Sequence, residues 1–361
     1  LGLTGFPTQS ATPSVPESHK DFDIFSRLVD DTLEKGVIEK AVPSKREFVS
    51  TIFLRPKKDG SHRVILNLKR FNEWVPYQHF KMDNLSAVLP LIGRDFYFTS
   101  VDIVHAYFSV AVRERDRDFL QFILGEQRYR FTCLPNGLAS APRMFTQMMR
   151  AVLGDVRQRT DAIISAYLDD IIVCHSDAEV VSHGTKILVD TLQDLGFLVH
   201  PDKSVLQPTK RIEHLGFVID SSSLTVQLPD AKITEIRQVC RDFRDAESPS
   251  VRQLACLAGK LQATSQAIPL AHLYTMNIVL DKNRGLVDSR GDFEAKTTLS
   301  ERSRRDLDWW IRHVGSDVRA IKDPPVQVEI YTDASKTGWG MFVETTDWSY
   351  GEAWSTKEAH R

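Results

Sequence analysis

The chain has 361 residues, of which 42% are hydrophobic and 26% charged, and its formal net charge at pH 7 is −2. This composition is that of an ordinary globular protein, and the length allows two or three domains with hydrophobic cores of their own. No run approaches eighteen apolar residues, so the sequence excludes a membrane-spanning segment and predicts no membrane partner. The net charge does not by itself indicate nucleic-acid binding, which makes the local distribution of charge more informative.

Four cysteines, Cys133, Cys174, Cys240 and Cys256, are widely spaced, and no C-x-x-C motif occurs. This spacing argues against a zinc finger or a dithiol redox centre. We expect four buried free thiols in a reducing compartment, that is, an intracellular protein of the cytoplasm and/or nucleus.

The first twenty residues are rich in Ser, Thr and Pro and lack the basic-then-apolar pattern of a secretion signal. They predict a loose leader over residues 1–20. Because the chain begins at Leu1 and not at Met, we expect it to be a piece of a longer protein.

Hydrophobic periodicity predicts the elements of residues 21–225. In chain order they are a helix over 22–33 stopped by Gly36, strands 48–55 and 63–68 joined through Gly60, a strand over 96–102, paired strands 119–124 and 128–131 about Gly125, a helix from Pro142 to Leu153, a hairpin over 162–174, and a helix over 180–195 stopped by Gly196. The order strand, helix, hairpin, helix, strand indicates an α+β domain.

The pattern becomes helical after Pro229, which predicts a small helical bundle over residues 226–280. A polar stretch opens a connection over 281–325 that includes one more helix, 307–311, and ends near Pro324-Pro325. A new strand is expected over 326–332. The bundle carries five basic residues that would either follow a duplex backbone or form a solvated face, namely Arg237, Arg241, Arg244, Arg252 and Lys260.

The stretch Tyr167-Leu168-Asp169-Asp170 stands between two apolar runs, which predicts a β-hairpin with adjacent carboxylates at its tip. Asp102 ends another apolar strand. Adjacent carboxylates repel each other, and a divalent cation allows both to ionise. Three carboxylates on neighbouring strand ends would form the site that two-metal phosphoryl transfer requires, although the four-residue stretch alone fits a solvated acidic turn equally well.

Residues 55–70 contain six Lys or Arg against the single acid Asp59. Phosphates of a template and an incoming nucleotide would need such a strip, whereas charge alone is also consistent with a solvated hairpin face.

Six sequence blocks occur in a fixed order along residues 22–217. They are Lys57-Lys58-Asp59-Gly60 with Arg63, Ser100-Val101-Asp102 with Ala106-Tyr107-Phe108, Leu134-Pro135-Asn136-Gly137-Leu138 with Ser140-Ala141-Pro142, Tyr167-Leu168-Asp169-Asp170, Leu195-Gly196-Phe197 with Pro201-Asp202-Lys203, and His214-Leu215-Gly216-Phe217. This series resembles the reverse transcriptases of retroelements. Later stretches are most similar to DIRS-like (tyrosine-recombinase) retrotransposons, namely 224–229, 254–261 and 331–335 with Gly338-Trp339-Gly340.

The resemblance implies an α+β right-hand polymerase fold followed by a truncated RNase H-like α/β segment. Fingers and palm would occupy residues 21–225, a thumb-like region 226–280, a connection 281–325 and a partial RNase H-like domain 326–361. It implies an RNA-directed DNA polymerase of a retrotransposon, which extends a primer 3′-hydroxyl with dNTPs on an RNA or DNA template. The partners would be an RNA template, a DNA primer or duplex, and dNTPs. Sequence leaves the oligomeric state open.

The resemblance also assigns site residues. Asp102 and Asp169 would bridge two Mg²⁺ ions, with Mn²⁺ as an alternative; Asp170 would act mainly through the electrostatics of the site, and the Ile103 carbonyl would complete one metal site. The remaining residues would contact substrates. Lys57 and Arg63 would bind the triphosphate, Tyr107 would act as a steric gate on a strand leaving the site, and Lys203 would donate a proton to pyrophosphate. Asn136 and Gly137 would contact the sugar and template, and Leu215, Gly216 and Phe217 would form the primer grip.

Two positions depart from or vary within the family pattern: Asn67 stands where many relatives have an acid, and Asn136 lies at a variable position. His105 lies near Asp102, but a lone histidine is more often structural, and it receives no role. Two other functions stay open, a degenerate relic that binds nucleic acid without catalysis and a DNA-templated polymerase with the same palm.

At the carboxyl end, Asp333 resembles the first metal-binding acid of RNase H-like domains, with the next strands expected at 338–343 and 351–354. Glu358 is the only late candidate for a second acid, and it falls too early in register. Because hybrid cleavage needs several carboxylates, we expect this segment to be inactive as an RNase H.

Overall fold

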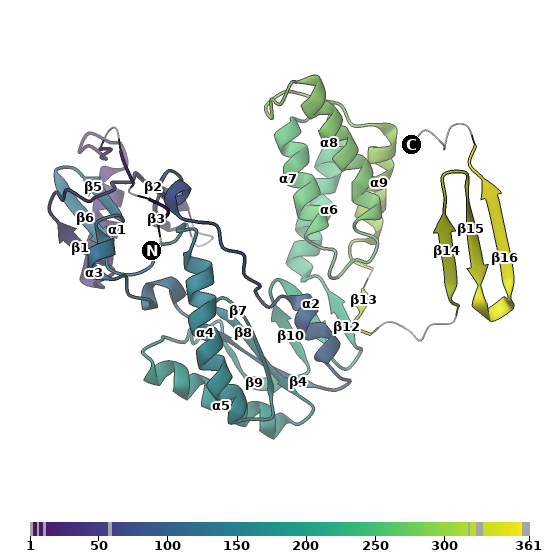
Figure 1. Cartoon of the computed structure of the whole chain (residues 1–361), viewed down its shortest axis with the longest axis horizontal. Helices are drawn as coiled ribbons and strands as arrows, with labels where there is room; N and C mark the ends of the chain where they lie inside the picture. Colours follow the sequence, from purple (N-terminus) through teal and green to yellow (C-terminus); the bar gives the residue numbers. More distant parts are fainter. Residues whose placement is uncertain are drawn as a thin grey trace. The chain divides into compact units, whose positions relative to one another are not determined.

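A computed structural model describes residues 3–5, 7–9, 12–56, 60–316, 318–322 and 328–355. The chain divides into two compact units, Leu1–Ile321 and Lys322–Arg361. Figure 1 traces the helices and strands of both units in chain order.

The central sheet of the first unit has the strand order β7-β8-β4-β9. Its members are β4 (Tyr97–Asp102), β7 (Ile163–Tyr167), β8 (Asp170–His175) and β9 (Val205–Thr209). Helices α4 (Ala141–Gln158) and α5 (Ala178–Asp194) pack on one face (Figure 1). The predicted order of strand, helix, hairpin, helix and strand is confirmed.

Apolar residues run without interruption through β8 because this strand is buried on both faces. Ile171 and Val173 join the core under α4 and α5, whereas Ile172 and Cys174 point into the core shared with the helical bundle. Alternate side chains of a strand face opposite sides, so a strand covered on both sides reads as a continuous apolar run.

A second sheet, of order β1-β6-β5, lies in the N-terminal part of the chain. It contains β1 (Ile38–Ala41), β5 (Gln121–Leu124) and β6 (Gln127–Phe131), while α1 (Phe22–Glu34) and the hairpin of β2 (Ile52–Pro56) and β3 (His62–Leu66) pack nearby. The predicted helix and both strand pairs are confirmed, although the strand predicted over 48–55 is divided: Val49 bridges to Gln121 of β5, and only the later residues pair with β3.

Short helical elements complete the first unit. They are η1 (Phe71–Trp74), α2 (Leu85–Val88), η2 (Leu89–Leu91), η3 (Ala106–Ser109), α3 (Glu114–Arg117) and η4 (Leu273–Thr275).

The expectation of a loose leader is wrong for several of its described residues. Val15 is buried, donates its N–H to the Ile123 carbonyl at 3.1 Å, and accepts from the Gly125 N–H at 2.7 Å. Gln9 forms two hydrogen bonds with the backbone of Val49. Residues of this polar leader therefore form hydrogen bonds with β5, the turn after it and Val49, which composition alone does not reveal.

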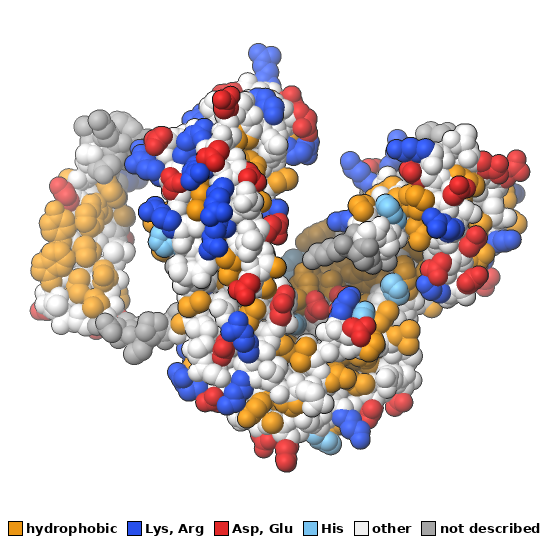
Figure 2. Space-filling view, turned by 180° about the vertical axis from the view of Figure 1, so that it is seen from behind, with side chains coloured by type: hydrophobic (Ala, Val, Ile, Leu, Met, Phe, Trp, Pro, Cys, Tyr) orange, Lys and Arg blue, Asp and Glu red, His pale blue; other side chains and the backbone are white. Residues whose placement is uncertain are grey.

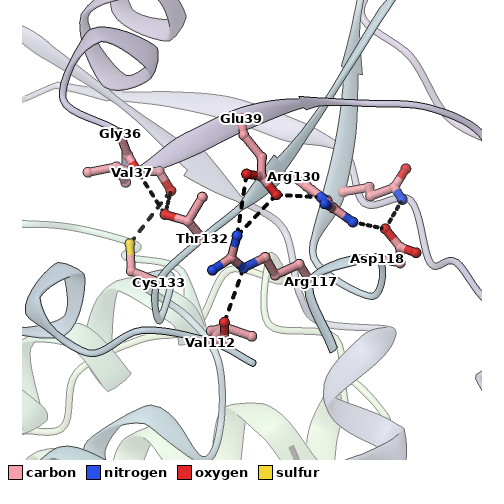
Figure 3. Close-up of polar contacts among 10 residues, drawn as sticks. Gly36, Val37, Glu39, Val112, Arg117, Asp118, Arg130, Thr132 and Cys133 are labelled. Carbon is pink, nitrogen blue, oxygen red and sulfur yellow. Dashed lines mark hydrogen bonds and ion pairs between the residues drawn. The ribbon is translucent and has the colours of Figure 1, made fainter. Parts of the chain in front are cut away.

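Ion pairs connect the strands of this sheet with α3 and the residue after it (Figure 3). Glu39 on β1 lies directly opposite Arg130 on β6 and accepts from its guanidinium at 2.7 Å. The same Glu39 accepts from Arg117 of α3 at 3.2 Å, and Arg130 also donates to Asp118 at 2.8 Å. Because these groups are partly shielded from water, charged hydrogen bonds here fix the sheet more strongly than exposed pairs would.

A helical bundle follows, formed by α6 (Asp230–Asp245), α7 (Val251–Gln262), α8 (Met276–Asp288) and α9 (Glu301–His313). The predicted boundary at residue 281 between the bundle and a connection is wrong, because Asp281 lies in the middle of α8. The Asp281 carboxylate is buried and accepts from the Ser300 N–H at 2.7 Å and the Ser303 hydroxyl at 2.6 Å. Asp281 of α8 thereby satisfies backbone and side-chain donors at the N-terminus of α9. This tertiary contact compensates for the burial of a polar residue within α8.

The bundle packs onto a sheet of order β10-β11-β12-β13. Its strands are β10 (Arg211–His214), β11 (Phe217–Asp220), β12 (Thr225–Gln227) and β13 (Arg319–Ala320).

His214 on β10 is 5% exposed, and burial lowers the pKa of its imidazole to about 4 from the usual 6.5. The unfolded chain therefore binds a proton below pH 6.5 that the folded chain does not. Stability is complete above that pH and is expected to fall by about 3 kcal/mol as the pH drops from 6.5 to 4.

Urea denaturation at several pH values between 6.5 and 4 measures the free energy of unfolding of the wild type and of His214→Leu. The variant should show a shallower loss of stability with acid, and His272→Gln, at an exposed position, should follow the wild type. Parallel curves for wild type and His214→Leu would contradict the assignment.

The second unit is an antiparallel sheet of order β14-β15-β16. Its elements are β14 (Ile330–Ala334), β15 (Gly338–Val343), η5 (Glu344–Thr346) and β16 (Trp348–Ala353). Exposed apolar side chains gather on the face visible in Figure 2, and Ile330, Trp348 and Tyr350 are about half exposed. The strand expected over 326–332 is described from Ile330 onward, and the two strands expected after it are confirmed.

The cysteine prediction is wrong at one position. Cys133, Cys174 and Cys240 are buried, whereas Cys256 is exposed on α7. Within the described residues, no helix combines the length and apolar character needed to cross a membrane.

Candidate active site

The hairpin of β7 and β8 ends in a two-residue turn. Tyr167 pairs with Asp170, which leaves Leu168 and Asp169 as the turn, and Leu168 has a φ of 55°. A β-hairpin turn of two residues requires positive φ, a conformation that is strained for leucine. The Asp169 carbonyl accepts from the Ile103 N–H at 3.1 Å, so the hairpin tip is bound to the end of β4.

Asp102, the last residue of β4, lies opposite Asp170 in the β4–β8 register. Asp102, Asp169 and Asp170 therefore lie on adjacent strand ends, as the sequence predicted. Asp102 keeps 20% of its side-chain surface exposed, so a substrate or cation can reach its carboxylate.

Burial and nearby negative charge disfavour ionisation of Asp169 and Asp170. Burial raises the pKa of Asp170 to about 6, and the nearby charges of Asp169 and Asp102 add to the effect. The pKa of Asp169 is raised by burial and by Asp102, although a hydrogen bond from the backbone counteracts part of the rise. A cluster of partly buried carboxylates with raised pKa values is typical of a functional site.

The residues present fit divalent cations. Each additional positive charge would relieve the repulsion between the carboxylates. Within the described ranges, no three acidic, histidine or cysteine side chains already converge on one cation position. Magnesium commonly binds one or two carboxylates and takes its other ligands from substrate phosphates and water, so a complete protein cage is not required.

Lys203 and Tyr107 lie beside these acids. The Lys203 Nζ lies 4.0 Å from the nearer carboxylate oxygen of Asp102. Tyr107 packs edge-on against Phe145, with 5.8 Å between ring centroids, and burial followed by the charge of Asp169 raises the pKa of its hydroxyl to about 12.

The predicted backbone around Tyr107 is wrong. The residue lies in η3 and not on a strand, because His105 adopts a φ of 51° and turns the chain directly after β4. His105 thus has a conformational role at this turn, and its ring stacks on Phe108 at 5.5 Å.

Asn136 and Gly137 form an exposed turn before α4. Sequence reasoning missed the residue that holds this turn, Asn72. Its side-chain amide donates to the Gly137 carbonyl, and its side-chain oxygen accepts from the Ala139 N–H, both at 2.9 Å. These contacts fix the turn to η1, but no contact in the described structure joins it to the three acids.

Leu215 and Gly216 form the two-residue turn between β10 and β11, with φ values of 51° and 76°. The next residue, Phe217, is 7% exposed, and Lys232 of α6 lies over its ring at 5.2 Å. Successive residues with positive φ are typical of a tight hairpin turn, which glycine adopts without strain. Asp333 lies in the second unit, on β14, and Glu358 lies outside the described residues.

The predicted basic strip, residues 55–70, includes the end of β2, all of β3 and the residues that follow β3. Arg63 and Arg55 are both exposed and lie opposite each other in register. Lys57 falls outside the described residues. In the helical bundle, Arg244 pairs with Asp245 and Asp308, and Lys260 pairs with Glu235.

Affinity for a primer–template duplex should fall steeply with salt, because bound cations release counterions from phosphates. Replacing Arg55 and Arg63 together by Gln should make the slope of log K against log salt shallower by about 2, since each phosphate contact contributes about 0.9. Fluorescence anisotropy across a salt series measures this. Arg244→Gln is the matched control, because its guanidinium already has carboxylate partners. An unchanged slope in the double variant would exclude these arginines from phosphate contact.

Comparison with known proteins agrees with this geometry. Residues 55–219 match the protein-family model described as Reverse transcriptase (RNA-dependent DNA polymerase). Polyprotein P3 of Commelina yellow mottle virus is 23% identical over 358 residues, covering 94% of this chain and 17% of that protein. The retrovirus-related Pol polyprotein from transposon opus of Drosophila melanogaster is 26% identical over 203 residues, covering 55% of this chain and 20% of that protein.

A solved structure of the foamy viral protease-reverse transcriptase in complex with RNA/DNA hybrid superposes with a TM-score of 0.71 at 17% identity, covering 99% of this chain and 46% of that one. The fold is therefore the right-hand polymerase fold. Over residues 55–219 the chain is similar to the reverse transcriptase domains of retroelement polyproteins, a family that uses divalent metal ions. It spans no more than about a fifth of the length of these two polyproteins.

Proposed function

We propose that this chain is an RNA-directed DNA polymerase of a retrotransposon, which extends a primer 3′-hydroxyl with dNTPs on an RNA or DNA template. The observation that carries the proposal is the placement of Asp102 at the end of β4, opposite Asp170 at the start of β8, with Asp169 in the adjoining turn. The match of residues 55–219 to the reverse transcriptase family supports it, as does similarity in fold to a foamy viral enzyme in complex with RNA/DNA hybrid.

Asp102 and Asp169 would hold two divalent cations, Mg²⁺ or Mn²⁺, together with the Ile103 carbonyl. Such cations lower the pKa of an attacking hydroxyl and neutralise a triphosphate. Asp170 would add negative charge to the site without needing to ligate. The Lys203 ammonium, 4.0 Å from Asp102, would stabilise the ionised carboxylate and donate a proton to the departing pyrophosphate.

The other predicted residues would bind substrates. Tyr107 would place its ring beneath the sugar of the incoming nucleotide and exclude a 2′-hydroxyl. Arg63 would bind the triphosphate together with Lys57. The turn of Asn136 and Gly137 would contact the nucleotide sugar and template.

The turn of Leu215, Gly216 and Phe217 would hold the primer. Lys232 already packs over the Phe217 ring, so a cation stands beside the surface that a primer phosphate would approach.

We further propose DIRS-like retrotransposons as the group of origin, an intracellular location in the cytoplasm and/or nucleus, and an RNase H-like segment over residues 326–361. The three-stranded antiparallel sheet with Asp333 on its first strand supports the last point.

Primer extension by the purified chain tests the central proposal. Matched RNA and DNA templates with the same primer and Mg²⁺ should both be copied. Binding without extension would indicate a degenerate relic, and extension confined to the DNA template would indicate a DNA-templated polymerase.

A further inference from the structure

The segment before β9 extends the pairing of β4 past its last residue. The Val104 N–H donates to the Leu198 carbonyl at 2.7 Å, and the His200 N–H donates to the Asp102 carbonyl at 2.8 Å. Ile103 and Val199 lie opposite each other between these bonds. Asp102 is thus paired through its carbonyl oxygen as in an ordinary antiparallel ladder.

The ladder is interrupted at the next bond. In a regular antiparallel pair the Asp102 N–H would donate to the His200 carbonyl. That carbonyl instead accepts from the Ser204 N–H at 3.1 Å, because the chain turns through Pro201 and resumes pairing with β4 only where Val205 lies opposite Ser100. The turn therefore removes the backbone acceptor that the Asp102 N–H would have used.

A side chain replaces the missing acceptor. The Ser204 hydroxyl oxygen accepts from the Asp102 N–H at 3.0 Å. The preceding residue, Lys203, places its ammonium 4.0 Å from the carboxylate of the same aspartate. One turn thus contacts Asp102 at its N–H, at its carbonyl and at its carboxylate.

We propose that Ser204 is a positioning residue for the polymerase reaction, which holds the backbone of Asp102 so that its carboxylate stays aligned with Asp169 for divalent-cation binding. This inference rests on the proposed polymerase function. The backbone bond acts two bonds away from the side chain that would ligate the cation, and small displacements of a ligand are costly because catalysis depends on its geometry.

Three variants separate this role from general stabilisation. Ser204→Ala removes the acceptor and leaves the Asp102 N–H unpaired, whereas Ser204→Thr keeps the hydroxyl. Ser221→Ala is the matched control: its buried hydroxyl bonds to the Phe96 carbonyl, directly before the opposite end of β4.

The first measurement uses the full chain without metal or nucleic acid. Hydrogen–deuterium exchange with fragmentation should show the Asp102 amide exchanging about tenfold faster in Ser204→Ala, the factor expected for one lost hydrogen bond. Ser204→Thr and Ser221→Ala should keep wild-type exchange at this amide. Equal Asp102 exchange in Ser204→Ala and the wild type would overturn the proposal.

The second measurement is Mn²⁺ binding, followed by electron paramagnetic resonance of the free ion. The dissociation constant should rise about tenfold in Ser204→Ala and return towards the wild-type value in Ser204→Thr. In primer extension, kcat should fall about tenfold while the KM for dNTP stays within twofold.

The outcomes distinguish this proposal from the proposed function. Wild-type Mn²⁺ affinity in Ser204→Ala, or the same loss in Ser221→Ala, would overturn the positioning role even in an active polymerase. Absence of primer extension by the wild type, with altered exchange and Mn²⁺ binding in Ser204→Ala, would count against the polymerase function and leave the Asp102 contact supported.

Discussion

Replacing Asp102 or Asp169 by Asn should reduce the single-turnover rate of primer extension by about a thousandfold or more, equivalent to about 4 kcal/mol of activation free energy. Asparagine keeps the size of aspartate but carries no charge, so the site would lose affinity for divalent cations while the fold persists. Asp170→Asn should cost less, because in the proposed site Asp170 adds negative charge without needing to ligate the cations.

Rapid-quench primer extension at saturating Mg²⁺ measures these rates, and fluorescence anisotropy verifies that the variants still bind the duplex. Asp155→Asn is the matched control, since this exposed acid of α4 pairs only with Arg159 within the described structure. Near-normal extension by Asp102→Asn or Asp169→Asn would refute the assignment of the catalytic site.

Replacing Tyr107 by Val should raise ribonucleotide incorporation relative to deoxyribonucleotide incorporation by about 10- to 100-fold in the ratio of kcat/KM values, as expected when a single steric contact sets the discrimination. The ring is held edge-on against Phe145 close to Asp169. It therefore occupies space beside the acids that a smaller side chain would open to a 2′-hydroxyl.

Tyr107→Phe provides the control. It keeps the ring and should retain the selectivity of the wild type, because burial keeps the tyrosine hydroxyl neutral, with a pKa of about 12. Steady-state kinetics with matched ribonucleotides and deoxyribonucleotides gives both ratios. If the ratio for a folded Tyr107→Val protein equals that of the wild type, this ring is not the gate.

The central sheet and its acids could be predicted from sequence because their signals are local and strong. β8 is apolar throughout, since both of its faces are buried, and the adjacent acids at the hairpin tip stand out against that pattern. The turn between β5 and β6 could likewise be predicted from Gly125, which adopts a φ of 59°.

Other features depend on contacts between distant parts of the chain. The sequence predicted a connection from residue 281 because the stretch that begins there is polar. The buried Asp281 carboxylate is paired by hydrogen bonds from Ser300 and Ser303 and by an ion pair with Arg284, and the two serines lie outside α8. The turn into η3 depends on the left-handed conformation of His105, which no propensity predicts. The bond between Ser204 and Asp102 joins residues 102 positions apart and leaves no periodic pattern in sequence.

The unequal burial of the cysteines makes the helical bundle selectively addressable by thiol chemistry. Burial raises the pKa of Cys133 to about 11 and those of Cys174 and Cys240 to about 12, so these thiols resist alkylation at neutral pH. Cys256 on α7 is exposed. A maleimide dye should therefore attach to α7 without any engineered mutation, and a change in its fluorescence on addition of a duplex would test whether nucleic acid approaches this helix.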